Sequence, residues 1–438
     1  MSYILVIICV LAAIFFYIRY KNFYNPPFLM AVFWAIITFF STFGLYNQDI
    51  ADDRTYLVCL IGMIGFFVGS LVNKKITFRP IKIKSTTNDL RQVAIVANNK
   101  VITVILVILI VILLQRDIRV MSLLASGVKM NQIRVDFNNI VLNSAFERAF
   151  NTYIVMPLIY LLPAIVIPEF IAFRKRIINL ILTILVLIEF AVCDGGRAPF
   201  YYCAIFVLCS LYIFHIDFKN VITVFRSKSK KTKRLISIVA VGVVAIALYM
   251  IVFLSASRDI SYSVGNSIYT YFTGCFPFLE YNLNIIDQNN VCTFGSAFFH
   301  GILTIVLYLL NALQLCAYPD FYNYVHEWGN IQEFINIGSA NFNAFVTPFY
   351  YFYMDLGYFG VLLGSAVYGL IAIQIYHRMK SQITYNFKYI AAYMLIVQSI
   401  ATSMIRWQFY NANFVMAFVL LLLIPAQKEE TQRLSKHF

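Results

Sequence analysis

The sequence is poor in charged residues. Only 12% of its 438 residues are charged, whereas a soluble globular protein carries about 25%. Hydrophobic residues make up 61% of the chain, and the mean hydropathy is +0.77. This composition excludes an ordinary soluble domain and predicts an all-α, polytopic integral membrane protein with a single membrane domain over 1–438.

The sequence also lacks the short motifs by which many enzymes bind nucleotides or metals. It contains no GxxxxGK[ST] phosphate loop, no HExxH and no GxGxxG fingerprint. Its eight cysteines show no metal-ligand spacing. We therefore expect no cofactor, no metal site and no use of ATP, so the energy for any reaction has to come with the substrate.

Eleven apolar segments have about the length that a membrane span needs, which is roughly 20 residues. Basic loops follow alternate spans, and all of them lie on one side only if the N-terminus is outside and the C-terminus is cytoplasmic. The predicted spans are 3–18, 27–46, 55–73, 98–114, 151–172, 177–193, 199–216, 235–254, 357–376, 388–404 and 408–425.

Two regions on the outer side are longer than turns, a loop at 115–149 and a large region at 255–356. The large region contains apolar stretches at 267–282 and 297–317, which Gly, Pro, Glu and His interrupt. We interpret these stretches as interfacial or re-entrant helices. In the alternative they form two further spans, 13 in all, and residues 318–340 lie inside.

Lysine is nearly missing from the outer side. The inner segments hold 25 of the 34 basic residues, 16 Lys and 9 Arg, which is the ordinary positive-inside pattern. The outer side holds one Lys and eight Arg. Because the guanidinium fork matches phosphate and carboxylate, this bias predicts an anionic, phosphate-bearing substrate. The eight are Arg54, Arg116, Arg119, Arg134, Arg148, Arg197, Arg258 and Arg406.

The densest polar constellation lies at the outer end of the 177–193 span. Glu189 is followed by Asp194, a Gly pair and Arg197. An ionisable residue within a membrane helix is a functional candidate, and the Gly pair lets the backbone bend sharply beside a ligand. The alternatives are a neutral Glu189 that bonds a neighbouring helix and an Arg197 that reaches lipid headgroups.

An enzyme that breaks a lipid-pyrophosphate bond needs cations at the leaving phosphates and a base near the acceptor hydroxyl. We predict phosphate or substrate binding by Arg197, Arg258, Arg134, Arg406, Asp194 and Tyr271. For the base we rank His300 and Glu280 ahead of Asp355, with His326, Glu327 and Asp259 as further candidates. Structural alternatives remain open: a packed His300, an Asp355 that caps a helix, a local Arg258–Asp259 pair, and surface or headgroup contacts for the arginines.

Four segments carry a family resemblance: NPPFLMAVFW, GGRAPF, SRDI with Tyr271 and Gly274 after it, and NAFVTPFYYFYMDLGYFG. They resemble the bacterial oligosaccharide repeat-unit polymerases, the Wzy-type O-antigen and capsule polymerases. The resemblance extends over the whole chain through topology, and GGRAPF and the YMDLG segment are its most specific parts. By this resemblance Arg197 and Arg258 fall at phosphate- or sugar-binding positions, whereas no residue matches a family base.

The resemblance implies a metal-independent, GT-C-like glycosyltransferase of the bacterial cytoplasmic (inner) membrane. Such an enzyme transfers a growing glycan from undecaprenyl pyrophosphate to the non-reducing end of a new repeat unit. The implied partners are the undecaprenyl-pyrophosphate-linked oligosaccharide, membrane lipid and a chain-length regulator (co-polymerase), and we expect no nucleic acid. Two rival functions are an O-antigen ligase and a flippase or transporter for the lipid-linked unit.

Overall fold

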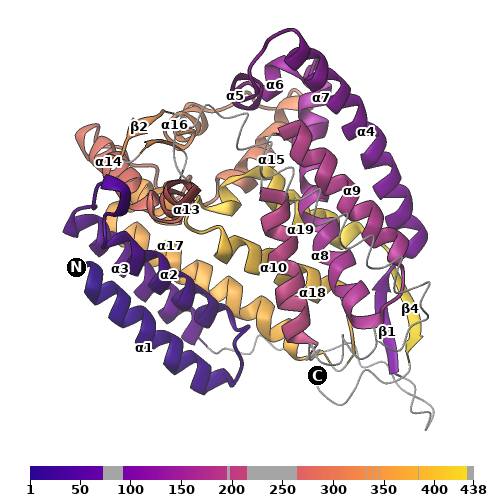
Figure 1. Cartoon of the computed structure of the whole chain (residues 1–438), viewed down its shortest axis with the longest axis horizontal. Coiled ribbons are helices and arrows are strands. Elements are labelled where there is room, and N and C mark those ends of the chain that lie inside the picture. Colours follow the sequence, from indigo (N-terminus) through magenta and orange to yellow (C-terminus); the bar gives the residue numbers. More distant parts are fainter. Residues whose placement is uncertain are drawn as a thin grey trace. The chain divides into compact units, whose positions relative to one another are not determined.

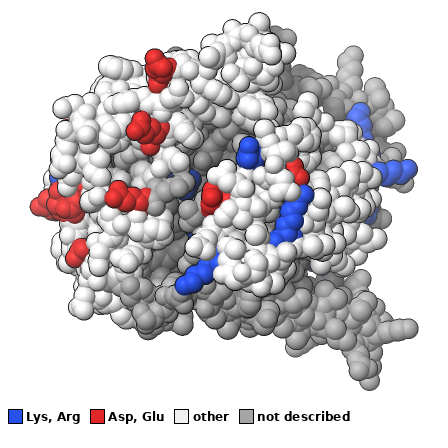
Figure 2. Space-filling model, turned by 90° about the horizontal axis from the view of Figure 1, so that it is seen from above, with Lys and Arg blue, Asp and Glu red and all other residues white. Residues whose placement is uncertain are grey.

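The computed structural model describes residues 1–72, 92–194, 198–214, 264–331, 333–338, 340–343, 345–382 and 384–431. The chain is mostly helical, at 76% (Figure 1). Five helices are long and apolar enough to cross a membrane: Ser2–Tyr20, Asp53–Leu71, Asn99–Ala125, Ala145–Phe173 and Thr347–Lys380. On the face drawn in Figure 2 most of the surface is uncharged. The predicted helical membrane protein is confirmed at this level.

The chain divides into two compact units, and each is built from separate stretches of sequence. The first unit comprises Met1–Thr86, Tyr262–Gln382 and Leu395–Phe418. Its elements are α1 (Ser2–Tyr20), α2 (Pro26–Ser41), η1 (Leu45–Asn47), α3 (Asp53–Leu71), α13 (Val264–Thr273), α14 (Cys275–Gln288), α15 (His300–Ala312), α16 (Asp320–Gly329), β2 (Ile335–Asn336), β3 (Asn341–Phe342), α17 (Thr347–Lys380) and η3 (Gln408–Tyr410).

The second unit comprises Thr87–Ser261, Ile383–Met394 and Val419–Phe438. Its elements are β1 (Gln92–Ala97), α4 (Asn99–Ala125), α5 (Met130–Val135), α6 (Phe137–Ile140), α7 (Ala145–Phe150), η2 (Asn151–Val155), α8 (Met156–Phe173), α9 (Ile177–Asp194), α10 (Ala198–Ile213) and β4 (Ala426–Thr431). Two helices contribute residues to both units, α18 (Phe387–Ala401) and α19 (Ala412–Leu423).

Each predicted span within the described residues coincides with a helix, and only 235–254 lies outside them. Helix α4 runs on to Ala125, so the predicted loop at 115–149 is largely helical. The apolar stretch at 267–282 forms parts of two helices, α13 and α14, which meet at Gly274. A Cβ at Gly274 would lie 2.6 Å from the carbonyl oxygen of Thr270, so only glycine fits at this junction between the two helices.

Helices α3 and α17 pack closely because glycines face the partner backbone. A Cβ at Gly69 would collide with the carbonyl oxygen of Ala366, and a Cβ at Gly369 would collide with that of Phe66. Small residues let membrane helices approach until backbone and side chains are in van der Waals contact. This contact fixes α17, whose first half carries the aromatic run of residues 349–353.

Replacing Gly69 by alanine should therefore destabilise the first unit. The added methyl group meets backbone rather than a movable side chain, and overpacking of this kind costs about 1–3 kcal/mol. We expect a lower midpoint of thermal unfolding in detergent micelles. The control is Val68→Ala on the same helix, where the side chain is 53% exposed and the midpoint should hardly move. Equal midpoints for Gly69→Ala and the wild type would contradict the packing argument.

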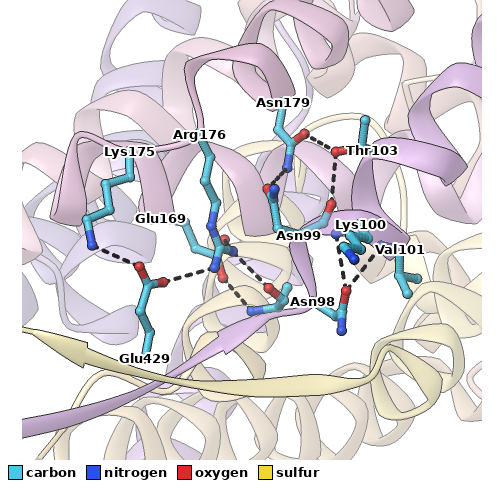
Figure 3. A network of polar contacts seen from close by, with 11 residues as sticks. Asn98, Asn99, Lys100, Val101, Thr103, Glu169, Lys175, Arg176, Asn179 and Glu429 are labelled. Atoms are coloured by element: carbon cyan, nitrogen blue, oxygen red, sulfur yellow. Dashed lines mark hydrogen bonds and ion pairs between the residues drawn. The ribbon is translucent and has the colours of Figure 1, made fainter.

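A small antiparallel sheet in the second unit was not predicted. Strand β1 pairs with β4 from Gln92↔Thr431 to Ala97↔Ala426. The alternation in QVAIVA suits a strand, and pairing with the chain's last described segment satisfies its backbone groups. The sheet lies beside an ion-pair network, in which Glu429 accepts from Lys175 at 2.9 Å and from Arg176 at 3.0 Å (Figure 3).

The same arginine joins the sheet to α8. Arg176 donates to Glu169 at 2.9 Å and to the carbonyl oxygen of Ala97 at 2.8 Å, and Glu169 accepts from the amide of Ala97 at 2.7 Å. Burial raises the pKa of Glu429, but hydrogen bonds and charge from Lys175 and Arg176 outweigh it and hold that pKa below its ordinary value. Two of the basic residues counted as topology signals thus also hold the end of the chain in place.

Candidate functional site

Three of the outer arginines have partners within their own unit. Arg54 at the start of α3 forms an ion pair with Asp287 and donates to the hydroxyl of Tyr353 at 3.0 Å. Asp287 accepts from the same hydroxyl at 3.0 Å, so the three groups form a closed triangle. This arrangement fixes α3 to α14 and α17 and occupies the guanidinium.

Arg116 and Arg119 lie on α4 in the second unit. Arg116 is 6% exposed and donates to Asn151 Oδ1 at 2.6 Å. Arg119 donates to both carboxylate oxygens of Glu147, at 3.0 and 3.1 Å. Part of the preference for Arg over Lys on this side is therefore structural, because a bidentate contact such as that of Arg119 needs the guanidinium fork.

The remaining described arginines of the set are Arg134, Arg148 and Arg406. Within the described ranges no hydrogen bond or ion pair holds any of their side chains. Arg134 and Arg148 are exposed, whereas Arg406 is half-buried. Arg197 and Arg258 lie outside the described residues, and Asp194 is the last residue of α9. Of the described candidates for an anion ligand, Arg406 is thus the one that protein partly encloses.

The turn that carries Arg406 is held by the start of α17. The amide of Val346 donates to the carbonyl oxygen of Ile405 at 3.0 Å, and Thr347 and Arg406 form a parallel bridge. The charge of Arg406 acts on the hydroxyls of Tyr351 and Tyr410. Arg406 therefore lies beside a cluster of aromatic side chains from three separate parts of the sequence.

A buried histidine lies at the centre of that cluster. The ring of His300 stacks between Tyr410, at a centroid distance of 4.1 Å and 8° between planes, and Tyr322, at 5.1 Å and 6°. The ring of His326 stacks at 5.8 Å from it. We call these four side chains the aromatic–histidine stack. Helices α15 and α16 and the turn at η3 each contribute to it.

The hydrogen bonds of His300 fix its tautomer. Its Nδ1 lies 3.1 Å from the carbonyl oxygen of Tyr410, which can only accept, so Nδ1 carries the proton. Its Nε2 then holds a lone pair, and this atom is buried without a hydrogen-bond partner in the described part of the chain. Burial, with a smaller contribution from the neighbouring His326, outweighs the hydrogen bond to Tyr410 and lowers the pKa of His300 to about 4. The imidazole is therefore neutral at pH 7.

Two glycines permit the stack to be this tight. A Cβ at Gly301 would collide with the carbonyl oxygen of Phe409, and one at Gly329 would collide with the ring of Tyr410. Tyr410 also donates to the carbonyl oxygen of Val325 at 3.1 Å. This hydrogen bond fixes the ring of Tyr410 against α16, while the Tyr350 hydroxyl donates to the carbonyl oxygen of Trp328 at the end of that helix at 2.7 Å.

Asp355 organises the loop that leads into α15. Its Oδ1 accepts from the Thr293 hydroxyl at 2.6 Å and from the amides of Gly295 and Ala297 at 2.9 Å, and its Oδ2 accepts from the amide of Phe298 at 2.9 Å. Asp355 is 3% exposed. The alternative that Asp355 caps a helix is wrong, because Asp355 lies within α17 and its acceptor oxygens hold the turn before α15, whose N-cap Phe299 receives no side-chain cap. The four bonds give it a structural role.

Glu280 and Tyr271 lie in the same unit. Glu280 on α14 is half-buried, and its Oε2 accepts from the amide of Asp52 at 3.0 Å, just before α3 begins. Burial raises its pKa, and the neighbouring charges of Asp52 and Asp49 add to the rise. Tyr271 is 39% exposed, and its ring meets that of Phe345 edge-on at 5.0 Å. The roles predicted for them, a base for Glu280 and substrate binding for Tyr271, stay predictions.

The sequence analysis missed Tyr322 and Tyr410. Nothing local distinguishes them among the 30 tyrosines of the chain, because their roles depend on packing against His300. His326 was one of the further candidates, and its place beside His300 supports that choice. Comparisons with protein-family models, with curated proteins and with solved structures found no significant match, so the candidate site rests on its own residues.

Proposed function

We propose that the chain is a membrane glycosyltransferase that polymerises lipid-linked oligosaccharide repeat units at the outer face of the bacterial cytoplasmic membrane. It transfers the growing glycan from undecaprenyl pyrophosphate to the non-reducing end of a new unit. The observation that carries the proposal is the pairing of Arg406, a half-buried cation with no anionic partner in the described residues, with the buried lone pair of His300. The ring of Tyr410 stacks on His300, and its hydroxyl interacts electrostatically with Arg406.

In the proposed reaction the acceptor hydroxyl oxygen forms a bond to the anomeric carbon, and the bond from that carbon to the pyrophosphate oxygen breaks. The hydroxyl proton passes to His300 Nε2, and the electron pair leaves with the pyrophosphate. Arg406 neutralises the charge that develops on the phosphates. Arg197 and Arg258, which the sequence also assigns to phosphate binding, lie outside the described residues. Because Asp355 already accepts four hydrogen bonds, we assign proton transfer to His300 in preference to Asp355.

The burial of His300 adds a requirement. Its side chain is 4% exposed, so the acceptor hydroxyl reaches Nε2 only when a neighbouring element moves. The proposal assigns this motion to α16, which the hydroxyls of Tyr350 and Tyr410 hold by single bonds of 2.7 and 3.1 Å. Closing of such an element over the substrate would also exclude water, which protects the activated glycan from hydrolysis.

The surface polysaccharide of a strain that lacks this protein tests the proposal. We expect single repeat units at the surface and no polymer ladder. Polymer of normal length that stays on its carrier lipid would instead indicate a ligase. Lipid-linked single units that accumulate only on the cytoplasmic side would indicate a flippase. Either of these two results would overturn the proposed reaction.

The low pKa of His300 predicts an unusual pH profile. A histidine whose pKa lies at about 4 is in its basic form at every pH above about 4, whereas an exposed histidine loses the basic form below about 6.5. With purified protein and a lipid-linked repeat unit, kcat/KM for polymerisation should hold steady through mildly acidic pH and fall only near pH 4. An acid limb near 6.5 would instead assign the proton transfer to a group that solvent reaches, and His300 would lose the role.

A further inference from the structure

Two carboxyl groups lie on the neighbouring helices α4 and α9 in the second unit. Asp117 on α4 is 9% exposed, and its Oδ1 is buried with no hydrogen-bond partner in the described part of the chain. Oε2 of Glu189 on α9 is buried in the same way. The two helices pack along one another, and the two side chains interact electrostatically. We call Asp117 and Glu189 the carboxyl pair.

The cations nearby are engaged elsewhere. Arg116 precedes Asp117 in sequence, but its guanidinium donates to Asn151 at 2.6 Å. Arg119, one turn further along α4, is held by two bonds to Glu147. The thiol of Cys193, one turn after Glu189, lies near Arg116 and carries no positive charge. No ion pair to the carboxyl pair is present among the described residues.

Two ionised carboxylates at this place would be very unfavourable. Burial removes water from the Asp117 carboxylate and from Glu189 Oε2, and among the described residues no cation or hydrogen-bond donor replaces it. The two like charges would also repel each other across the helix contact. A bound metal ion would need more ligands than the pair offers, because hard cations take about six or more oxygens. Among the described residues no group of three or more His, Cys, Asp and Glu side chains could hold one.

We infer that Asp117 and Glu189 form a proton-binding site, in which the O–H of one carboxyl donates to an oxygen of the other. One proton satisfies the orphaned oxygen on each side and reduces the charge of the pair from two to one. When the proton leaves, both carboxylates are ionised and repel each other, so the contact between α4 and α9 depends on its presence. This inference does not depend on the proposed function.

Infrared spectroscopy of the full-length protein in lipid nanodiscs tests the site directly. An un-ionised carboxylic acid has a carbonyl stretching band that a carboxylate lacks. We expect the wild type to show such a band at neutral pH, and each single variant, Asp117→Asn or Glu189→Gln, to keep it, because the remaining acid stays neutral beside an amide. The double variant should lose the part of the band that this pair gives, and only the contribution of other acids that are half-buried or buried, such as Glu280 and Asp355, should remain. The control Glu147→Gln removes an acid that Arg119 holds, and it should leave the band unchanged.

Thermal unfolding provides a second, independent measurement. The amides of the double variant resemble the protonated pair in shape and cannot ionise. We therefore expect the midpoint of the wild type to fall from neutral to alkaline pH by more than that of the double variant. A wild type without the infrared band, or a double variant that keeps it in full, would overturn the inference. If the wild type lacks the band and also unfolds at a higher temperature in sodium chloride than in choline chloride, the pair is ionised around a bound cation.

Discussion

Replacing Arg406 by alanine should abolish chain elongation while the protein still accumulates in the membrane. Within the described residues no acid or carbonyl group depends on this guanidinium, so its loss leaves no buried partner unpaired. The charge that it supplies to the leaving phosphates disappears, and loss of one such preorganised donor lowers a rate by about 10²–10³. The polymer ladder of cells that carry the variant, together with its membrane abundance, measures both effects.

A lysine at the same position sharpens this test. Arg406→Lys keeps the charge but loses the planar fork, so we expect chain elongation to remain poor. The matched control is Arg148, which is also on the predicted outer side and also lacks a partner in the described ranges, but is exposed. Arg148→Ala should leave the ladder intact. A normal ladder from Arg406→Ala, with Arg148→Ala as normal, would remove Arg406 from the phosphate site.

Replacing Asp355 by alanine should prevent the protein from folding stably. The change leaves four donors around residues 293–298 without their acceptor, and each orphaned donor costs about 1–3 kcal/mol. The lower bound, about 4 kcal/mol for four donors, is comparable to the whole stability of a small domain. We expect little protein in the membrane and a strongly lowered unfolding midpoint in detergent. Asp320→Ala, an exposed acid on α16, should behave like the wild type.

The milder variant separates structure from chemistry. Asp355→Asn keeps one acceptor oxygen, so we expect an intermediate midpoint and activity in proportion to the folded fraction. If Asp355→Asn were folded as well as the wild type and yet inactive, Asp355 would be the base that the sequence analysis also considered. His300 would then lose its assignment.

The helices could be predicted from the sequence because hydropathy is a property of each segment by itself. The stretch 55–73 lies almost exactly on α3, and 177–193 lies on α9. The contacts that define the site could not be predicted, because they join distant segments. Asp355 was predicted to be a candidate base or the cap of the helix that follows it, whereas its partners lie about 60 residues earlier in the chain.

Composition was informative about charge type but not about the role of each residue. The preference for Arg on the predicted outer side predicted an anionic substrate, but it could not tell Arg54, which closes an ion pair, from Arg406, which has no such partner in the described residues. Likewise, the strand β4 could not be recognised in AQKEET, because its partner β1 lies more than 300 residues earlier.

The discontinuity of the two units has a consequence for synthesis in the cell. The indole of Trp34 on α2 donates to Ser403, 369 residues later, at 2.9 Å, and Asn22 donates to Tyr376, 354 residues later, at 2.7 Å. The first helices leave the ribosome long before these partners exist, and contacts so distant in sequence form late. The amino-terminal helices therefore lack these tertiary contacts in the membrane until nearly the whole chain has been translated. A fragment truncated by an early stop codon would therefore expose the unpaired faces of these helices, and quality-control proteases would degrade it.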